Sequence, residues 1–513
     1  MPKKLLILLC VSVPSFMINL DSNIVAVSLT SIAHSMHADF AATEWVISAY
    51  TLAFATLLMP AGALADRFGR KRMLVLGLTL FTIASGICGA AHSAGVLNAA
   101  RALQGMGAAL QLSSALAILS HAFRGAERAK AFAFWGSVIG VAIMLGPVAG
   151  GFITQVLGWQ WAFYINLPVG VVMIAMTLYA VQESKDPHAI RIDLAGFLTF
   201  TSCLALLTLA LISGNRTGWD SKVIHAELFG SAAFFAIFLA VERVQKRPMI
   251  DFAYFRRPTF VGAQIAGVSF AAAFLVMLTY LPIYFEIGLG DSPMSAGLSM
   301  LPLAVPLFLV PRIVVWYFDK RLTGRAFLAV GLALVGIGLL WTGFRIAAFS
   351  YAAILPSMLV ASLGAGILNG QIAKVGMTVI PPERAGMASG LSGTIRFTGI
   401  VVGFAGLGAV LLQRIGNRVG HGLPDASFAV RQLITHAIAN GNFVAPPPLL
   451  QRYPQLPVLV RESLGAGYEG VLLSAGLIAV VASVLCWLLI SDRETAPHGA
   501  TEVSDAALGM PVD

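Results

Sequence analysis

The sequence has little charge. Only 11% of its 513 residues are Asp, Glu, Lys or Arg, whereas 58% are hydrophobic. A soluble globular domain carries about 25% charged residues, so this composition excludes a soluble domain held by one membrane anchor. The mean hydropathy of +0.84 agrees. The composition is therefore that of a polytopic membrane protein.

Cysteine and nucleotide-binding motifs are also scarce. The four cysteines lie in apolar runs without CxxC spacing, so we expect neither a disulfide nor a metal site. No GxxxxGK[ST] loop is present, which argues against ATP as the energy source. No paired catalytic carboxylates are visible, so we expect neither an enzyme nor a cofactor. The net charge of +9 comes from basic residues in loops, which indicate membrane topology and not nucleic-acid binding.

Long apolar runs fill most of the chain. A membrane helix needs about 20 mostly apolar residues. Fourteen stretches meet this requirement: 5–29, 44–65, 73–92, 96–119, 131–153, 161–181, 194–212, 226–242, 259–281, 295–317, 326–345, 352–372, 386–412 and 469–490. Most Lys and Arg residues fall in the loops of one side, and positive charge marks the cytoplasmic side. We therefore expect fourteen helices in the cytoplasmic (inner) membrane, with both termini in the cytoplasm.

One outer segment, 413–468, carries several arginines against this bias. Long loops are translocated largely regardless of charge, so the predicted topology stands. Residues 426–440 predict a short surface helix within this segment. The polar tail that follows residue 490 is predicted to be disordered.

A basic loop separates the second and third apolar runs. Asp66 precedes Arg70 by four residues, so the two can pair across a tight turn. Gly69 permits a backbone turn that residues with a β-carbon resist, and the basic residues hold the loop in the cytoplasm. The residues of this motif are Gly62, Asp66, Arg67, Gly69, Arg70, Lys71 and Arg72.

This Gly-x-x-x-Asp-Arg-x-Gly-Arg-Lys-Arg spacing resembles the loop signature of the major facilitator superfamily of transporters. The resemblance implies an all-α fold of two homologous six-helix halves and a loop that acts as a conformational latch. A weaker copy of the loop spans residues 317–325. Because two further helices are predicted between the halves, the chain resembles the fourteen-helix drug:proton antiporter branch. We expect an N-terminal half at 1–182, a two-helix linker at 183–250, a C-terminal half at 251–490 and a cytoplasmic tail at 491–513.

A second motif of the same branch lies in the fifth apolar run. Glycines there let neighbouring helices pack at short distance, and a proline removes one backbone hydrogen bond and permits a bend. The resemblance implies an exporter, since importers largely lack this motif; simple packing of small residues is the alternative. The motif residues are Gly140, Gly146, Pro147, Gly150 and Gly151.

Asp21 and Arg101 are the candidate proton-coupling pair. Both lie at similar depth in predicted membrane helices, where an ionisable residue suggests function, and a carboxylate in a low-dielectric site can load and release a proton. Glu286, at the outer end of the ninth run, is a second candidate acid; an exposed interfacial acid is the alternative. Asp21 points nearly opposite the polar stripe of its own helix, which consists of Ser12, Ser15, Asn19 and Asn23. Either Pro14 shifts the helical phase, or Asp21 faces a neighbouring helix and not the cavity.

Polar side chains at helical spacing indicate where a substrate would bind. We predict a cavity between the two halves, lined by Asn19, Asn23, Gln104, Gln111 and Arg396. Arg396 lies near mid-membrane, where it disfavours a cationic group nearby and suits an anionic or zwitterionic one; a structural link to a backbone carbonyl is its other explanation.

The resemblance implies proton-coupled export of small amphipathic compounds or drugs. Export of an endogenous metabolite, lipid or siderophore is an alternative, as is import or facilitated transport by the same fold. The expected partners are a small-molecule substrate, protons and the lipid bilayer. In a host with two membranes, a periplasmic adaptor protein is a further expected partner.

Overall fold

The computed structural model describes residues 3–36, 40–123, 125–185, 194–245, 252–318, 321–380, 385–439 and 453–495. Every regular element in them is helical, as the long apolar runs predict. The helices of the N-terminal bundle are α1 (Lys3–Met36), α2 (Phe40–Phe68), α3 (Arg70–Gly89), α4 (Ala94–Ala122), α5 (Gly125–Val156), α6 (Trp161–Tyr164) and α7 (Asn166–Ala180).

Two helices follow the N-terminal bundle, α8 (Leu194–Thr217) and α9 (Lys222–Val244). They pack against each other, and α8 also packs on α2 and α16. An apolar cluster holds them there, because Phe200 and Phe238 join Phe260, Met59 and Leu391 from both bundles. The two additional helices therefore sit at the seam between the bundles.

The remaining helices form a C-terminal bundle. Its elements are the 3-10 helix η1 (Phe252–Arg256), α10 (Pro258–Phe270), the π-helix η2 (Ala271–Leu275), α11 (Val276–Gly288), α12 (Pro293–Ile313), the π-helix η3 (Val314–Phe318), α13 (Gly324–Ile346), α14 (Tyr351–Leu368), α15 (Gln371–Thr378), α16 (Ala385–Gly422), α17 (Phe428–Ala439) and α19 (Leu456–Leu489).

The number of membrane spans agrees with the sequence at a coarser level. Among the described residues, twelve helical stretches are long and apolar enough to cross a bilayer. Two shorter apolar helices lie within α5 and α8, at Lys130–Ala142 and Ala195–Leu211. The chain is thus a multi-pass membrane protein with twelve to fourteen spans.

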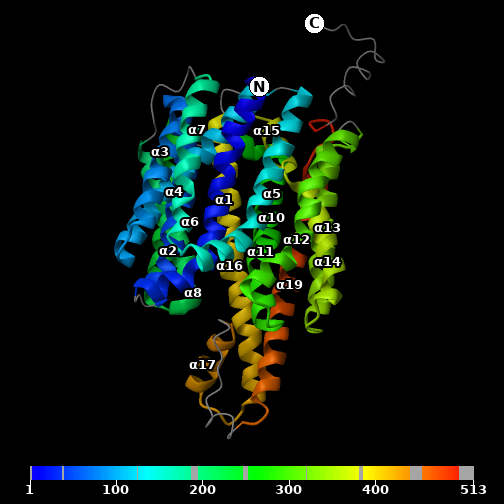
Figure 1. The fold of residues 1–513 in the computed structure, drawn as a ribbon. Helices are drawn as coiled ribbons and strands as arrows, with labels where there is room; N and C mark the ends of the chain where they lie inside the picture. Colours follow the sequence, from blue (N-terminus) through cyan, green and yellow to red (C-terminus); the bar gives the residue numbers. More distant parts are fainter. Residues whose placement is uncertain are drawn as a thin grey trace.

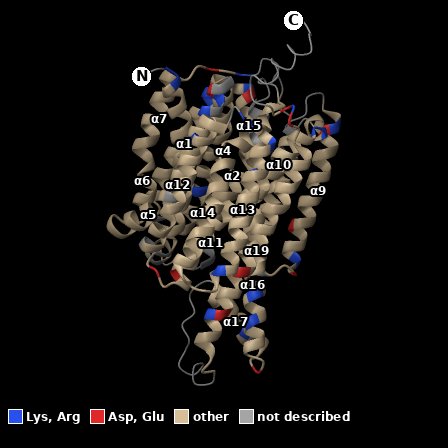
Figure 2. Ribbon diagram, turned by 90° about the vertical axis from the view of Figure 1, so that its right-hand side faces the viewer, with Lys and Arg blue, Asp and Glu red and all other residues tan. Residues whose placement is uncertain are grey.

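The start of α1 and the end of α19 lie at one end of the molecule, and α17 lies at the other (Figure 1). Lys and Arg residues gather at the end where α1 starts and again along the part of the molecule near α16 and α17 (Figure 2). This is the charge distribution that the sequence predicts, with one basic outer segment as the exception.

The outer segment 413–468 differs from its prediction, because most of its described part is helix and not loop. Helix α16 is 38 residues long and α19 is 34, or about 57 and 51 Å at 1.5 Å per residue, against a hydrocarbon core of about 30 Å. Both helices extend beyond the bundle beside α17 (Figure 1). The short helix predicted at 426–440 is present as α17. Its Ile434 is buried in the apolar core that α16 and α19 continue outward.

Four predicted spans are interrupted. The sixth run is split between α6 and α7 at Ile165, and the tenth passes from α12 into the π-helix η3. The ninth run continues to Gly288 through the π-helical turn η2. The twelfth run is broken after Leu368, and α15 starts only at Gln371. Hydropathy alone does not reveal such breaks, because each run as a whole stays apolar despite single polar residues such as Asn369 and Gln371.

The two bundles meet on two sides. Helix α5 packs on α12 and on α15, and α16 packs on α2 and α4. Glycine makes the contact between α2 and α16 close, because a β-carbon on Gly393 would lie 2.7 Å from the Leu58 side chain. One turn further, the rings of Phe54 and Phe397 meet edge to face at 4.5 Å.

Candidate functional site

Asp21 and Arg101 form an ion pair in the interior of the N-terminal bundle. The Arg101 Nη1 atom donates to Asp21 Oδ2 at 2.7 Å, and the two side chains are 1% and 0% exposed. Helices α1 and α4 therefore bring together the two charges that the sequence places at equal depth. Breaking a buried pair by removing one partner costs about 3–5 kcal/mol, because it leaves an uncompensated charge.

The other carboxylate oxygen of Asp21 accepts two neutral donors. Gln104 Nε2 and Asn166 Nδ2 each donate to Asp21 Oδ1 at 2.9 Å. Gln104 Nε2 also reaches Ser85 Oγ at 2.8 Å. Because all three groups around the carboxylate are donors, the arrangement suits an ionised Asp21.

Arg101 is held independently of Asp21. Its Nε donates to the carbonyl oxygen of Val46 at 2.9 Å, and its Nη1 also donates to Gln104 Oε1. The guanidinium lies over the ring of Tyr50, 4.2 Å from the centroid, where a cation gains from the ring's electrons. Arg101 therefore stays partnered even when Asp21 carries a proton.

The position of Asp21 resolves the alternative left open by the sequence. Its partners come from α4 and α7, so it faces neighbouring helices of its own bundle. The polar stripe on the opposite side of α1 faces α5 instead. There Trp135 Nε1 donates to Ser15 Oγ at 2.9 Å, and Asn23 contacts Gly146.

The structure does not bring together, around one common space, the residues predicted to line a cavity. Asn19 and Asn23 donate to carbonyl oxygens of their own helix, at 2.8 and 2.7 Å. Gln104 belongs to the Asp21 network, and Gln111 is buried with its Nε2 3.2 Å from Gly77 O on α3. The predicted cavity stays a prediction.

Arg396 and Glu286 lie outside the network, on helices of the C-terminal bundle. Arg396 is half-buried on α16, between the positions that contact α2 and those that contact α10. Within the described part of the chain, its guanidinium has no hydrogen bond or ion pair. Glu286 is exposed on α11. The structure thus leaves a mid-helix positive charge available beside the contact between the bundles.

The loop motif forms the predicted pair. Arg70 Nη2 donates to Asp66 Oδ1 at 2.9 Å, and both side chains are buried. Gly69 has φ +109°, a backbone conformation that favours glycine. The buried Gly62 lies on α2 in the same motif. The local geometry of the loop is therefore the one its sequence predicts.

A residue outside the predicted motif holds this loop in place. Glu183, just beyond α7, accepts from the backbone N–H groups of Lys71 and Arg72 at 3.1 and 3.2 Å. A β-carbon on Gly69 would lie 2.4 Å from the Glu183 carboxylate. An acid at the N-terminus of a helix is favourable because unpaired N–H groups point there. Arg67 lies over the adjacent Phe68 ring at 5.1 Å.

The weaker copy of the loop has a parallel arrangement. Asp492, just beyond α19, accepts from Thr323 Oγ1 at 2.6 Å and from Arg325 Nη1 at 2.8 Å, at the start of α13. In each bundle an acid that follows the last helix therefore holds the start of the third helix. Of the copy's residues, 319 and 320 lie outside the described residues.

The glycine motif on α5 has three different environments. Gly146 and Gly150 pack against α1, where a β-carbon would lie 2.2 Å from Asn23 and 3.1 Å from Ile24. Gly140 faces the other bundle, where a β-carbon would lie 3.4 Å from Leu307. Close packing was also expected at Gly151, but a β-carbon there would meet nothing within 4 Å. The side chain of Pro147 lies outside the described residues.

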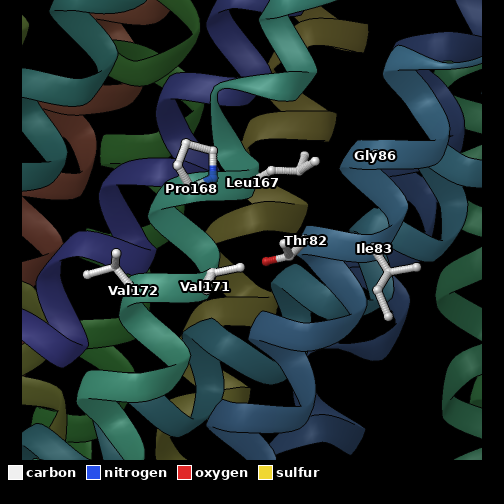
Figure 3. Close-up of a pocket in the computed structure, with 7 residues that line it drawn as sticks. All are labelled: Thr82, Ile83, Gly86, Leu167, Pro168, Val171 and Val172. Atoms are coloured by element: carbon white, nitrogen blue, oxygen red, sulfur yellow. The ribbon is translucent and has the colours of Figure 1, made fainter.

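A shallow apolar groove runs between α3 and α7 on the outside of the bundle (Figure 3). Its lining residues are Thr82, Ile83, Gly86, Leu167, Pro168, Val171 and Val172. None of them is charged, and none is predicted to line the substrate cavity. The groove is therefore a different feature from that cavity.

Sequence reasoning missed the network residues Asn166 and Ser85. Asn166 is the first residue of α7, in a segment otherwise notable for its aromatic residues. The sequence offered one indication, an amide side chain at the depth of Asp21. This indication is weak because the packing of α7 against α1 is not visible in the sequence. Glu183 was missed for the same reason.

Comparison with known proteins shows the family to which this chain belongs. A profile of the Major Facilitator Superfamily matches residues 11–404. The multidrug resistance protein Stp of Mycobacterium tuberculosis is 36% identical over 411 residues, which cover 80% of this chain and 76% of Stp. A probable actinorhodin transporter of Streptomyces coelicolor is 32% identical over 432 residues, 82% of this chain and 75% of that protein.

The chain belongs to the major facilitator superfamily. It is related to drug efflux pumps and is a membrane transporter, not an enzyme. The fold matches a solved structure of the proton:xylose symporter XylE with a TM-score of 0.62 at 15% identity, covering 97% of this chain and 98% of the other. At that identity the likeness concerns the fold alone.

Proposed function

We propose that this protein exports small amphipathic compounds across the cytoplasmic membrane in exchange for protons. The observation that carries the proposal is the buried Asp21–Arg101 pair in a membrane-spanning bundle. Such a pair is costly to bury, and an ionisable residue within the membrane suggests a proton or substrate pathway. The kinship to drug efflux pumps supports the direction of transport.

The network suggests how a proton would be taken up. The carboxylate of Asp21 is surrounded by donors, so it binds a proton only after at least one donor turns away. Arg101 keeps its bonds to Val46 O and Gln104 Oε1 when this happens. The proton can therefore replace one contact while the guanidinium keeps two neutral acceptors, and movement of α1 or α7 would control the exchange.

The topology that fits this function has fourteen spans with both termini in the cytoplasm. Its halves are residues 1–182 and 251–490, with the two-helix linker 183–250 between them and a tail from 491. The position of the start of α1 and the end of α19 at one end of the molecule supports it, as does the gathering of basic residues there (Figure 2). In a host with two membranes, the helical extension formed by α16, α17 and α19 would project into the periplasm, where an adaptor protein could bind.

The latch role of the loop belongs to the same proposal. A buried, charge-assisted bond between Asp66 and Arg70, fixed through Glu183 to the end of α7, would stabilise one arrangement of the helices over another.

A second candidate function is export of a compound made by the host cell. The relative described as a probable actinorhodin transporter favours it. The transport chemistry would be the same, and only the substrate would differ.

Inside-out membrane vesicles test the proposal. With an imposed pH gradient, acid inside, vesicles containing the protein should accumulate an amphipathic dye, and the accumulation should collapse when a protonophore is added. Accumulation that persists with the protonophore, or that requires ATP, contradicts proton exchange.

A further inference from the structure

The break between α14 and α15 lies directly against α5 of the other bundle. Helix α14 ends at Leu368, and Gly370 has φ +85° before α15 starts. A β-carbon on Gly370 would lie 2.9 Å from the carbonyl oxygen of Phe132 on α5. Glycine therefore serves two needs here, a left-handed backbone and a close approach to α5.

Asn369 uses this break to reach across the contact between the bundles. Its Nδ2 donates to the carbonyl oxygen of Gly136 on α5 at 2.6 Å. Glycines leave room for the amide, since β-carbons on Gly136 and Gly140 would lie 2.9 and 3.5 Å from it. By contrast, the contacts of Leu58 with Gly393 and of Phe54 with Phe397 between the same bundles are apolar.

We propose that Asn369 is a polar latch between the two bundles, and that its bond to Gly136 O stabilises the arrangement in which α5 and α15 are in contact. The hydrogen bond joins the two bundles at a point where they must separate when they tilt apart, whereas hydrogen bonds within each bundle persist. It therefore acts on the equilibrium between conformations and not on the fold.

This inference rests on the proposed transport function only because a transporter alternates between two arrangements. Its test measures a distance and does not require transport. Spin labels on Lys130→Cys of α5 and Thr378→Cys of α15 report the separation of the bundles in the full chain in lipid nanodiscs. Both positions are exposed, and the four native cysteines are buried.

We expect Asn369→Ala to raise the ratio of the long-distance to the short-distance population roughly two- to tenfold, the effect of one hydrogen bond. Asn369→Asp keeps the shape but sets acceptor against acceptor, so it should shift the ratio further. Gly136→Ala should act like Asn369→Ala, and the double variant should add little, because both changes remove one contact.

Ser362→Ala is the matched control. Its hydroxyl donates to Leu303 O at 2.6 Å within the C-terminal bundle, so the population ratio should not change. Unchanged ratios in both Asn369 variants overturn the proposal, as does an equal shift in Ser362→Ala. If Gly136→Ala fails to fold, the Asn369 variants alone decide. A shifted ratio in a protein without proton-driven export supports the latch and contradicts the proposed function.

Discussion

Two arginines in the membrane-spanning helices have opposite surroundings. Arg101 is fully buried and bonded to an acid, an amide and a backbone carbonyl. Arg396 is half-buried and, among the described residues, has no such bond. A charge near the bilayer centre costs roughly 2.5–3.5 kcal/mol on insertion scales. An arginine kept there without a protein partner is a candidate for contact with the substrate.

Arg396 should therefore select the charge of the exported compound. Arg396→Lys keeps the charge but loses the planar fork, so we expect normal membrane insertion with export reduced severalfold. Arg396→Ala should shift the preference towards cations. The measurement is the accumulation of one cationic and one anionic dye in cells that express each variant at matched levels.

Arg312→Lys is the control for this comparison, because Arg312 is exposed and bonds only to its own helix in the described structure. It should export both dyes normally. Unchanged export of both dyes by the two Arg396 variants would leave Arg396 a structural role only.

The pairing of Asp21 with Arg101 was predictable because both lie at similar depth in helices of one half. Asn166 was not, since depth gives no information on which faces of two helices meet. The same limit applies to Gln104 and Gln111. Their helical spacing correctly indicated one face of α4, but that face packs into the bundle.

At the scale of elements, the loop between α2 and α3 combines a buried ion pair with a turn at a positive φ, which glycine adopts without strain. Asp66→Ala should lower turnover about tenfold or more, because a hydrogen bond to a charged group contributes about 1.5–3 kcal/mol. Equilibrium substrate affinity should change little if the loop is a latch. Gly69→Ala should have a similar effect, since it meets both the positive φ and the Glu183 carboxylate.

Turnover and affinity are measured separately, by transport rates and by dye binding in detergent. Lys3→Ala, remote from the loop in sequence and exposed, is the control. A large loss of affinity with normal turnover in Asp66→Ala would rule out the latch.

The helical extension formed by α16, α17 and α19 has its own apolar core. Substitutions at two neighbouring residues of α17 test this packing. Ile434 on α17 is 1% exposed and Leu433 is 68% exposed. Ile434→Ala should destabilise α17 locally by about 2–4 kcal/mol, seen as faster hydrogen exchange at 428–438. Leu433→Ala should change it by less than about 0.5 kcal/mol. Equal effects of the two changes would mean that α17 does not pack as described.

The extension also shows where the prediction of helices from the sequence failed. Hydropathy detects a helix only while it crosses apolar lipid. Beyond it, α16 and α19 continue with exposed Arg418 and Glu462, which pair at 3.1 Å across the two helices. Such sequences, which mix charged and apolar residues, are predicted as loop, although their apolar residues remain aligned along one face of the helix.

For the whole molecule, the two ends should face opposite sides of the membrane. Leu322 is exposed at the start of α13, and Ser427 is exposed just before α17. With a membrane-impermeant maleimide on intact cells, Ser427→Cys should be labelled and Leu322→Cys should not. Labelling of both from outside would contradict the topology, and the unmodified protein, with its buried cysteines, gives the background.

The general architecture could be predicted from sequence because lipid forces each span into an apolar helix and basic loops set its direction. The contact between the bundles could not. Asn369 and Gly136 are 233 residues apart, and no periodicity in either helix signals that they touch.

The most direct test of the account is uphill transport by Asp21→Asn. The change keeps the size of the side chain but removes the proton site and replaces one acceptor oxygen with a donor amide. Purified protein in proteoliposomes is given an imposed pH gradient, and dye accumulation is followed beside gradient-free dye exchange. We predict that Asp21→Asn loses gradient-driven accumulation and retains part of the exchange. Normal gradient-driven accumulation by this variant would contradict the account, remove Asp21 from the coupling mechanism and leave Glu286 as the candidate acid.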